Sequence, residues 1–352
     1  MAIKITGTGS YIPSKIEKNE DFYNHKFLNA DGSEINSPNE VIVEKFKAIT
    51  GIEERRYIKK ELVNSDIAFF ASQKAIENAK IDKESIDYII VAHNYGDIKY
   101  NTQQSDTIPS IASRVKHLLK IENPKCVAYD ILFGCPGWIE GVIQAKAFIS
   151  SGLAKRCLVI GAETLSRVID PHDRDSMIYS DGAGAVIVED TKEEGGILAH
   201  ETATFALDEA HYIHFGETYN PEISDQRRYI KMYGRKIYEF ALTNVPKALK
   251  MCLNKSGKDI SDIKKILIHQ ANEKMDEAIV QRFYRLHKMK MPKGIMPMSI
   301  NLLGNSSVAT VPTLYDMILN GQLEGQEINK GDVIMFASVG AGMNINAIMY
   351  QV

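Results

Sequence analysis

Short apolar runs alternate along the chain with longer segments in which apolar residues recur every three or four positions. The short runs are typical of buried strands, and the longer segments have the spacing of helices with one buried face. The clearest strand candidates are 86–92, 157–163, 263–268 and 333–339. The clearest helix candidates are 64–80, 107–121, 234–257 and 307–321. This alternation of strands and helices predicts a layered α/β fold.

Parts of this pattern occur twice. Ile86 and Ile263 are 177 positions apart, and the apolar residues that follow them match at the same offset. The segments that resemble each other are 86–91 with 263–268, 157–163 with 333–339 at an offset near 175, and 132–135 with 302–305 at an offset of 170. Three matches at similar offsets predict two similar halves, which we place at residues 1–192 and 193–352.

The segment around Cys135 has the features of a helix start. Apolar residues after Pro136 recur at helical spacing until Gly152. Proline suits the first helical position and glycine suits the stop, so we expect Cys135 to be the N-cap. A thiol at the positive end of a helix dipole is favoured as thiolate. A buried cysteine without chemistry explains the same segment about equally well.

Composition excludes several classes of function. The chain has 352 residues and a net charge of −3, which gives no reason to expect nucleic acid or an anionic membrane as partner. No apolar run approaches the roughly 20 residues that span a bilayer, and no signal peptide is recognisable. The four cysteines form no CxxC pair, so neither a metal site nor a disulfide framework is predicted. We therefore expect a cytoplasmic protein with reduced thiols.

Two further residues follow apolar segments that belong to the repeat. His269 ends the strand candidate 263–268, and Asn305 matches Cys135 in the segment of offset 170. If the halves pack as a pseudo-dimer, these three side chains converge on one cleft. The N-terminal half, 1–192, then carries the nucleophile, and the C-terminal half, 193–352, carries the histidine and the asparagine. Each residue alone is more simply explained as structural.

At these residues the sequence resembles the thiolase-fold condensing enzymes, specifically 3-oxoacyl-(acyl carrier protein) synthase III. The resemblance runs over nearly the whole chain and rests on an ordered set of segments. They are DILFGCPGW, DPHDRDSMIYSDGAGAVIVE, ILIHQAN, LLGNSSVATVP and SVGAGMN, with ITGTGSYIP and ITGIEERRYI near the start. It implies a thiolase-like fold of two similar α/β halves in an α-β-α-β-α arrangement.

The resemblance also implies a division of roles. Cys135 takes an acyl group from a thioester, and His269 and Asn305 hold the thioester carbonyl of a malonyl extender and stabilise the enolate formed as CO₂ leaves. A 3-oxoacyl thioester is the alternative extender. The backbone N–H groups of Cys135 and Ala341 form the oxyanion hole. Arg174 lies near bound coenzyme A. Substrates arrive as coenzyme A or phosphopantetheine thioesters, and no other cofactor and no metal is implied.

The same resemblance implies partners. An acyl carrier protein is acidic in this family, so a basic surface should flank the active site. Lys274, Arg282 and Arg285 follow His269 and are our docking candidates, although a solvated helix face explains these charges equally well. A homodimer is implied, with the strand 157–163 near its interface.

The sequence departs from the family pattern where the family grips coenzyme A. Lys45 and Ile49 stand where a tryptophan and an arginine are frequent, and Glu53 replaces a usual basic residue. Residues 26–40 and 95–107 look like insertions, and the second lies near the expected acyl pocket. These departures favour a primer delivered on a carrier protein.

Several functions remain open at this stage. The chain initiates fatty acid synthesis, or it is a specialised ketosynthase of dialkylresorcinol or aryl-polyene pigment biosynthesis. An ester-forming acyltransferase of the same fold keeps the same three residues. A cysteine hydrolase ranks lower, because HQAN with LLGNSS resembles the decarboxylating arrangement. A non-catalytic carrier-protein binder is disfavoured by the intact set of Cys135, His269 and Asn305.

Overall fold

The N-terminal part of the chain folds into a five-stranded sheet. The computed structural model describes residues 2–102, 104–224 and 226–352. The strand order is β1-β7-β6-β4-β5, and the bounds are Ala2–Tyr11 (β1), Tyr88–Ala92 (β4), Val127–Ile131 (β5), Arg156–Thr164 (β6) and Asp181–Thr191 (β7). β4, β6 and β7 are almost wholly buried, which explains their continuous apolar sequences.

The second sheet repeats the pairing of the first. Its order is β8-β13-β12-β11, with bounds Gly196–Thr204 (β8), Ile263–Ile268 (β11), Val333–Gly340 (β12) and Asn344–Gln351 (β13). β1–β7 and β8–β13 are antiparallel, and β4–β6 and β11–β12 are parallel. Ile89 lies opposite Leu158, and Ile266 lies opposite Met335, so both strands of the pair repeat at an offset of 177. This corrects the offset near 175 that we expected for the second strand.

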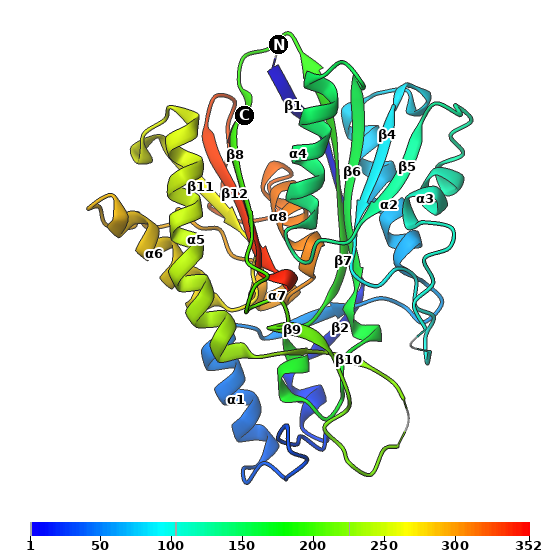
Figure 1. Cartoon of the computed structure of the whole chain (residues 1–352), viewed down its shortest axis with the longest axis vertical. Helices are drawn as coiled ribbons and strands as arrows, with labels where there is room; N and C mark the ends of the chain where they lie inside the picture. Colours follow the sequence, from blue (N-terminus) through cyan, green and yellow to red (C-terminus); the bar gives the residue numbers. More distant parts are fainter. Residues whose placement is uncertain (1, 103, 225) are drawn as a thin grey trace.

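Helices separate and cover the two sheets (Figure 1). α2 (Asn64–Ala79) and α3 (Ile111–Leu119) pack on the outer face of the first sheet. α4 (Gly137–Ser150) and α8 (Thr310–Leu319) lie between the sheets. α5 (Gly234–Ser256) and α6 (Glu273–Leu286) cover the outer face of the second sheet. The expected α-β-α-β-α arrangement is confirmed, and each predicted helical segment contains a helix.

Large aromatic side chains fill the space between the sheets. Trp138 of α4 meets Phe336 of β12 edge to face, with ring centroids 5.6 Å apart. Tyr315 of α8 meets the same Phe336 at 5.1 Å. Such contacts add to the stabilisation from burial of apolar area. They fix α4 and α8, whose N-terminal ends carry the candidate site, against both sheets.

The smaller elements gather at one end of the molecule, in the lower part of Figure 1. They are β2 (Lys15–Lys18), α1 (Asn39–Thr50), β3 (Glu54–Tyr57), β9 (Ile213–Gly216), β10 (Tyr229–Met232) and α7 (Ile300–Leu303). β9 and β10 form an antiparallel pair that the sequence pattern did not predict. None of the helices in the described parts of the chain is long and apolar enough to cross a membrane.

The edge strands of the first sheet are β1 and β5. β6 pairs with β7 on one side and β4 on the other, and nearly all of its residues are buried. β6 is therefore the central strand of this sheet and forms neither edge. The expectation that 157–163 lies near a dimer interface stays a prediction. Val127 and Leu132, by contrast, are 46% and 68% exposed along and just beyond β5.

Candidate active site

Cys135 occupies a tight turn between β5 and α4. Gly134 has φ of +69°, a conformation that glycine adopts without steric cost. The N-cap of α4 is Pro136, with φ of −72° and ψ of −4°. The expectation that Cys135 is the N-cap is thus wrong by one residue. The cysteine lies just before the helix start, and its side chain lines a cavity.

The thiol of Cys135 lies on the cavity wall, and the residue is partly buried. Burial raises its pKa to about 11, opposite to the direction that the helix dipole alone predicts. Desolvation disfavours the charged thiolate, and here it outweighs the helix start. The Ser307 hydroxyl, which donates to Sγ of Cys135 at 3.4 Å, acts in the other direction and stabilises negative charge on sulfur. At neutral pH the resting group is therefore the thiol.

Asn305 is held at both its backbone and its side chain. Its backbone pairs with the segment at Tyr179 in an isolated parallel bridge. Its side-chain Oδ1 accepts a hydrogen bond from the backbone N–H of Ser307 at 2.8 Å. Because Oδ1 is engaged, the orientation of the amide is fixed. Nδ2 has no hydrogen-bond partner among the described residues and remains available to a ligand in the cavity that Asn305 lines.

His269 follows directly after β11. Its backbone N–H donates to the carbonyl of Ala337 at 2.8 Å, which continues the β11–β12 ladder by one residue. The side chain is buried, and burial lowers the pKa of the imidazole to about 4. It is therefore neutral at physiological pH. Nδ1 is buried and has no hydrogen-bond partner among the described residues.

Ala341 lies in the turn 341–343 between β12 and β13, against the cysteine turn. Asn344 joins the two turns, because its Nδ2 donates to the carbonyl oxygens of Phe133 at 3.2 Å and Ala341 at 2.8 Å. The backbone N–H of Cys135 donates to no other residue in the described parts of the chain. The two backbones predicted to form an oxyanion hole are thus adjacent.

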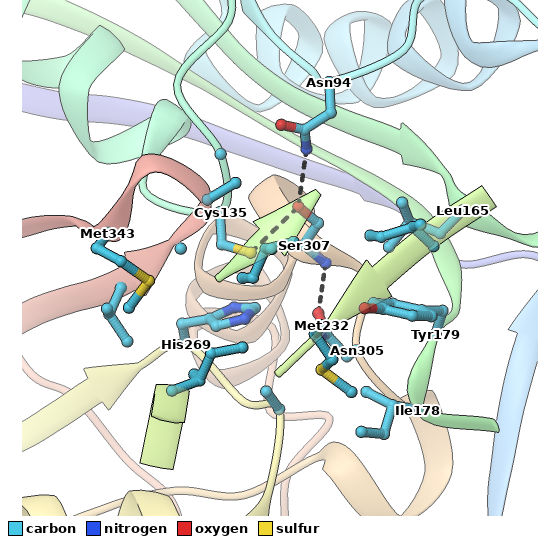
Figure 2. A pocket seen from close by; sticks show the side chains of 18 of the residues that line it. Asn94, Cys135, Leu165, Ile178, Tyr179, Met232, His269, Asn305, Ser307 and Met343 are labelled. Atoms are coloured by element: carbon cyan, nitrogen blue, oxygen red, sulfur yellow. Dashed lines mark hydrogen bonds between the residues drawn. The ribbon is translucent and has the colours of Figure 1, made fainter. Parts of the chain in front are cut away.

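Cys135, His269 and Asn305 face one another across an inner cavity (Figure 2). Its volume is about 80 Å³. The wall is mostly apolar and is built from Leu165, Ile178, Tyr179, Ile213, Ile230, Met232, Met275, Val339 and Met343. Ile213, Ile230 and Met232 belong to β9 and β10, so the unpredicted strand pair forms one side of the site.

An outer cavity of about 470 Å³ adjoins the inner one. Ile178 and Met232 line both cavities, so the two are neighbours along the same wall. Arg174 lines the outer cavity, as do Lys45 and Ile49 at the two positions where the family pattern changes.

The three docking candidates lie on α6. Lys274 is exposed in the first turn, two residues after Asn272, which lines the outer cavity. Arg282 and Arg285 are exposed further along the helix and line a separate groove between α5 and α6. The structure thus brings Lys274 close to the outer cavity and places the two arginines about two to three turns away along the helix.

Sequence reasoning missed two polar residues next to the nucleophile. Asn94, just beyond the end of β4, donates from Nδ2 to the Ser307 hydroxyl at 3.2 Å. Glu163, in β6, accepts from the same Nδ2. The available signals were a polar strand end after 86–92 and a carboxylate inside an apolar strand. No group of three or more metal-ligating side chains is present in the parts of the chain that the structure describes.

Comparisons with known proteins agree with this geometry. Family models described as 3-oxoacyl-[acyl-carrier-protein] synthase III, and its C-terminal part, match residues 129–205 and 253–352. The chain is 34% identical to beta-ketoacyl-[acyl-carrier-protein] synthase III 1 of Vibrio vulnificus, with 97% of each chain covered. It is 32% identical to the beta-ketoacyl-[acyl-carrier-protein] synthase III of Staphylococcus saprophyticus, over 99% of this chain and 98% of the relative.

A solved structure shows the same architecture. The 3-oxoacyl-[acyl-carrier-protein] synthase III of Aquifex aeolicus superposes with a TM-score of 0.81 at 29% identity, covering 99% of this chain and 100% of that one. The matches span both sheets and include the segments that carry the three candidate residues. The chain therefore belongs to the 3-oxoacyl-[acyl-carrier-protein] synthase III family of acyltransferases, which have the thiolase fold.

Proposed function

We propose that the chain catalyses a decarboxylative Claisen condensation between an acyl group on Cys135 and a malonyl thioester on a carrier protein. The observation that carries this proposal is the side chain of Asn305. Its Oδ1 is fixed by Ser307, and Nδ2 stays free on the wall of the cavity that holds His269 and Cys135. Burial lowers the pKa of His269 to about 4 and so makes the imidazole a weak general base for hydrolysis, whereas a free amide donor beside an imidazole N–H suits an enolate.

The first step is acyl transfer. Sγ of Cys135 attacks the thioester carbonyl of the primer, and the departing thiol takes up the proton that Cys135 loses. The tetrahedral oxyanion lies near the backbone N–H groups of Cys135 and Ala341. Pro136 has no N–H, so the amide of Cys135 itself serves here. The products are the acyl-Cys135 thioester and the free thiol of the primer carrier.

The second step forms the carbon–carbon bond. His269 and Asn305 donate hydrogen bonds to the thioester oxygen of the malonyl group, where negative charge develops as CO₂ leaves. The neutral imidazole of His269 retains one N–H for this purpose. The enolate carbon then attacks the acyl carbonyl on Cys135, and the thiolate leaves and takes up a proton. The product is a 3-oxoacyl thioester, and no metal or redox cofactor enters this balance.

We further propose that both thioesters are presented by an acyl carrier protein. Lys45 and Ile49 line the outer cavity in place of residues that grip free coenzyme A, whereas Arg174 is kept. Lys274 near this cavity, with Arg282 and Arg285 along α6, supplies positive charge for an acidic carrier. Free coenzyme A thioesters are then the weaker primers.

A second candidate is a specialised ketosynthase rather than an initiator of fatty acid synthesis. It is favoured by the inserted segment 95–107, because Tyr95 at its start lines the inner cavity beside Tyr179. Gln103 of this segment lies outside the described residues. Dialkylresorcinol and aryl-polyene pigments are the products we propose for this case, and an ester-forming acyltransferase is the remaining alternative.

A homodimer is also proposed, with its interface at the edge strand β5. Val127 and Leu132 supply exposed apolar surface there. Leu132→Glu should shift a dimer toward monomer in light scattering. An unchanged dimer mass would place the interface elsewhere.

Product analysis tests the proposed reaction. Wild-type protein is incubated with a panel of acyl-carrier and acyl-coenzyme A thioesters and with malonyl carrier protein, and the carrier-bound product is identified by mass spectrometry. We expect a 3-oxoacyl thioester two carbons longer than the primer, and none from Cys135→Ala. Release of free acid, or of an ester or amide, in place of that product would overturn the proposal.

A further inference from the structure

A chain of hydrogen bonds runs from a buried carboxylate to the nucleophile. Oε2 of Glu163 accepts from Nδ2 of Asn94 at 2.5 Å and from its backbone N–H at 3.0 Å. The same Nδ2 donates to Oγ of Ser307 at 3.2 Å, and Ser307 donates to Sγ of Cys135 at 3.4 Å. Figure 2 shows the last two of these bonds, which meet at Oγ of Ser307.

The direction of this chain follows from its chemistry. Oε2 of Glu163 accepts from the backbone N–H of Asn94 and therefore faces Asn94 as an acceptor, so the amide of Asn94 presents NH₂ to it and not its oxygen. One hydrogen of Nδ2 goes to Glu163 and the other goes to Ser307. Since Oγ of Ser307 then accepts from Asn94, its single proton is left for the sulfur of Cys135. An amide turned the other way would accept that proton and remove it from the sulfur.

Two features of this hydrogen-bond chain are energetically unfavourable, and packing alone does not explain them. Glu163 is 1% exposed, and its Oε1 has no hydrogen-bond partner among the described residues. An unpartnered buried polar atom destabilises the fold. Ser307 has φ of +54°, which is uncommon for a residue other than glycine. Strained backbone and unsatisfied groups of this kind concentrate at functional sites.

The neighbours of Glu163 hold the chain in place. His93, directly before Asn94, contacts Oδ2 of Asp130 through Nε2 at 3.0 Å and accepts from the N–H of Gly96 through Nδ1 at 3.0 Å. This fixes the turn that carries Asn94. Burial raises the pKa of the Glu163 carboxyl to about 7.

We propose that Glu163 and Asn94 are positioning residues that hold the Ser307 hydroxyl in the orientation that donates its proton to Sγ of Cys135. A thiolate forms on Cys135 during acyl transfer and again when the condensation product leaves. In both cases the Ser307 hydroxyl is already oriented to donate a hydrogen bond to it. This proposal rests on the proposed function for its purpose. Its test needs no substrate, so the two can fail separately.

The first test measures the thiol itself. The rate of alkylation of Cys135 by iodoacetamide is followed from pH 6 to 11 by peptide mass spectrometry on the full-length protein. Ser307→Ala should raise the apparent pKa of the Cys135 thiol by about one unit, a tenfold change in the thiol–thiolate equilibrium. Ser306→Ala is the matched control, because the Ser306 hydroxyl meets Thr310 and does not touch the sulfur. An unchanged pKa in Ser307→Ala overturns the proposal.

The second test separates orientation from charge. Glu163→Gln keeps an acceptor oxygen for Asn94, whereas Glu163→Leu, or Glu163→Met if that protein does not fold, removes it. Both remove the same negative charge, so a purely electrostatic role predicts equal thiol pKa values. We expect the apolar variant to have a thiol pKa about one unit above that of Glu163→Gln, a tenfold difference in thiolate at a given pH.

A double-mutant comparison tests whether Glu163 acts through Ser307. If Glu163 acts through Ser307, the difference between the two Glu163 variants disappears when Ser307→Ala is also present. Equal pKa values for the two Glu163 variants in the parent protein overturn the proposal. So does a difference that persists without the Ser307 hydroxyl.

Discussion

Gly134 lies directly against the backbone of Ala341. A methyl group added to Gly134 would come within 2.7 Å of the Ala341 nitrogen and 2.9 Å of its carbonyl oxygen. Gly340 makes the reciprocal approach, since a methyl group there would lie 2.5 Å from the nitrogen of Cys135. The cysteine turn of the first half and the turn after β12 in the second half thus meet backbone to backbone. This contact places the two N–H groups of the proposed oxyanion hole side by side.

We predict that Gly134→Ala lowers stability and acyl transfer together. A left-handed conformation costs an alanine about 1 kcal/mol, and the clash with Ala341 adds about 1–3 kcal/mol. Gly152→Ala is the matched control, because Gly152 has φ of +78° but nothing lies within 4 Å of an added methyl group. The unfolding free energy from chemical denaturation and the Cys135 acylation rate measure both effects. Equal losses in the two variants would contradict a close contact at Gly134.

We predict that the two halves of the reaction separate by mutation. Asn305→Asp keeps the oxygen that accepts from Ser307 but loses the free Nδ2 donor. It should retain acylation of Cys135 and lose about a hundredfold in malonyl decarboxylation, since one such donor is worth about 3 kcal/mol of barrier. His269→Ala should behave in the same way. The readouts are the acyl adduct mass and the rate of CO₂ release.

The control for these variants is Asn301→Asp. Asn301 is exposed on α7, four residues before Asn305, and its substitution should leave both rates unchanged. Decarboxylation at the native rate by Asn305→Asp or His269→Ala would show that the assigned roles are wrong.

The buried imidazole predicts a specific dependence of stability on pH. The pKa of His269 falls from an unfolded value of 6.5 to about 4 in the folded protein. Below pH 6.5 the unfolded chain binds a proton that the native state does not, so this group destabilises the fold as pH falls toward 4. The loss relative to His269→Gln should approach about 3 kcal/mol.

Unfolding free energies of both proteins between pH 4.5 and 7.5 provide the measurement. His211→Gln, at an exposed position, is the control and should show no such trend. A wild-type protein that gains stability over His269→Gln as pH falls would mean that His269 is charged in the native state.

Charge on α6 should matter for carrier thioesters alone. Lys274→Glu and Arg285→Glu are predicted to raise KM severalfold for an acyl carrier substrate and to leave KM for the matching coenzyme A thioester unchanged. The effect should shrink at high salt, because exposed charges are screened. Lys192→Glu serves as control, because Lys192 is exposed and directly follows Thr191, which pairs with Ala2 at the start of β1. Equal effects on both substrates would argue against carrier docking here.

The layered fold could be predicted because its signals are local and repeated. The strand pairs β4–β6 and β11–β12 have buried, continuous apolar sequences, and their common offset of 177 appears in the chain itself. The β9–β10 pair could not be predicted in this way. Its strands are only four residues each and far apart in the sequence, and β9 is partly exposed while β10 is mostly buried, so no common periodicity distinguishes them.

The site could be predicted only as far as single residues follow recognisable segments. Cys135, His269 and Asn305 do so, and all three line one cavity. The Glu163–Asn94–Ser307 chain depends on contacts between residues 69 and 213 positions apart, which no local pattern encodes. The predicted direction of the pKa shift of the Cys135 thiol was wrong for a related reason. The helix start is visible in the sequence, but the burial that outweighs it is a property of the assembled cavity.

The central claim is that Cys135 carries the acyl group and transfers it to a malonyl-derived carbanion. The most direct measurement is the intact mass of the protein after exposure to an acyl-carrier thioester, followed by peptide mapping and then by addition of malonyl carrier protein. The account predicts one acyl adduct on the peptide containing Cys135, which disappears when malonyl carrier protein is added as the 3-oxoacyl product forms. An adduct on another residue, no adduct from any donor, or an adduct that water removes equally fast without malonyl carrier protein would contradict it.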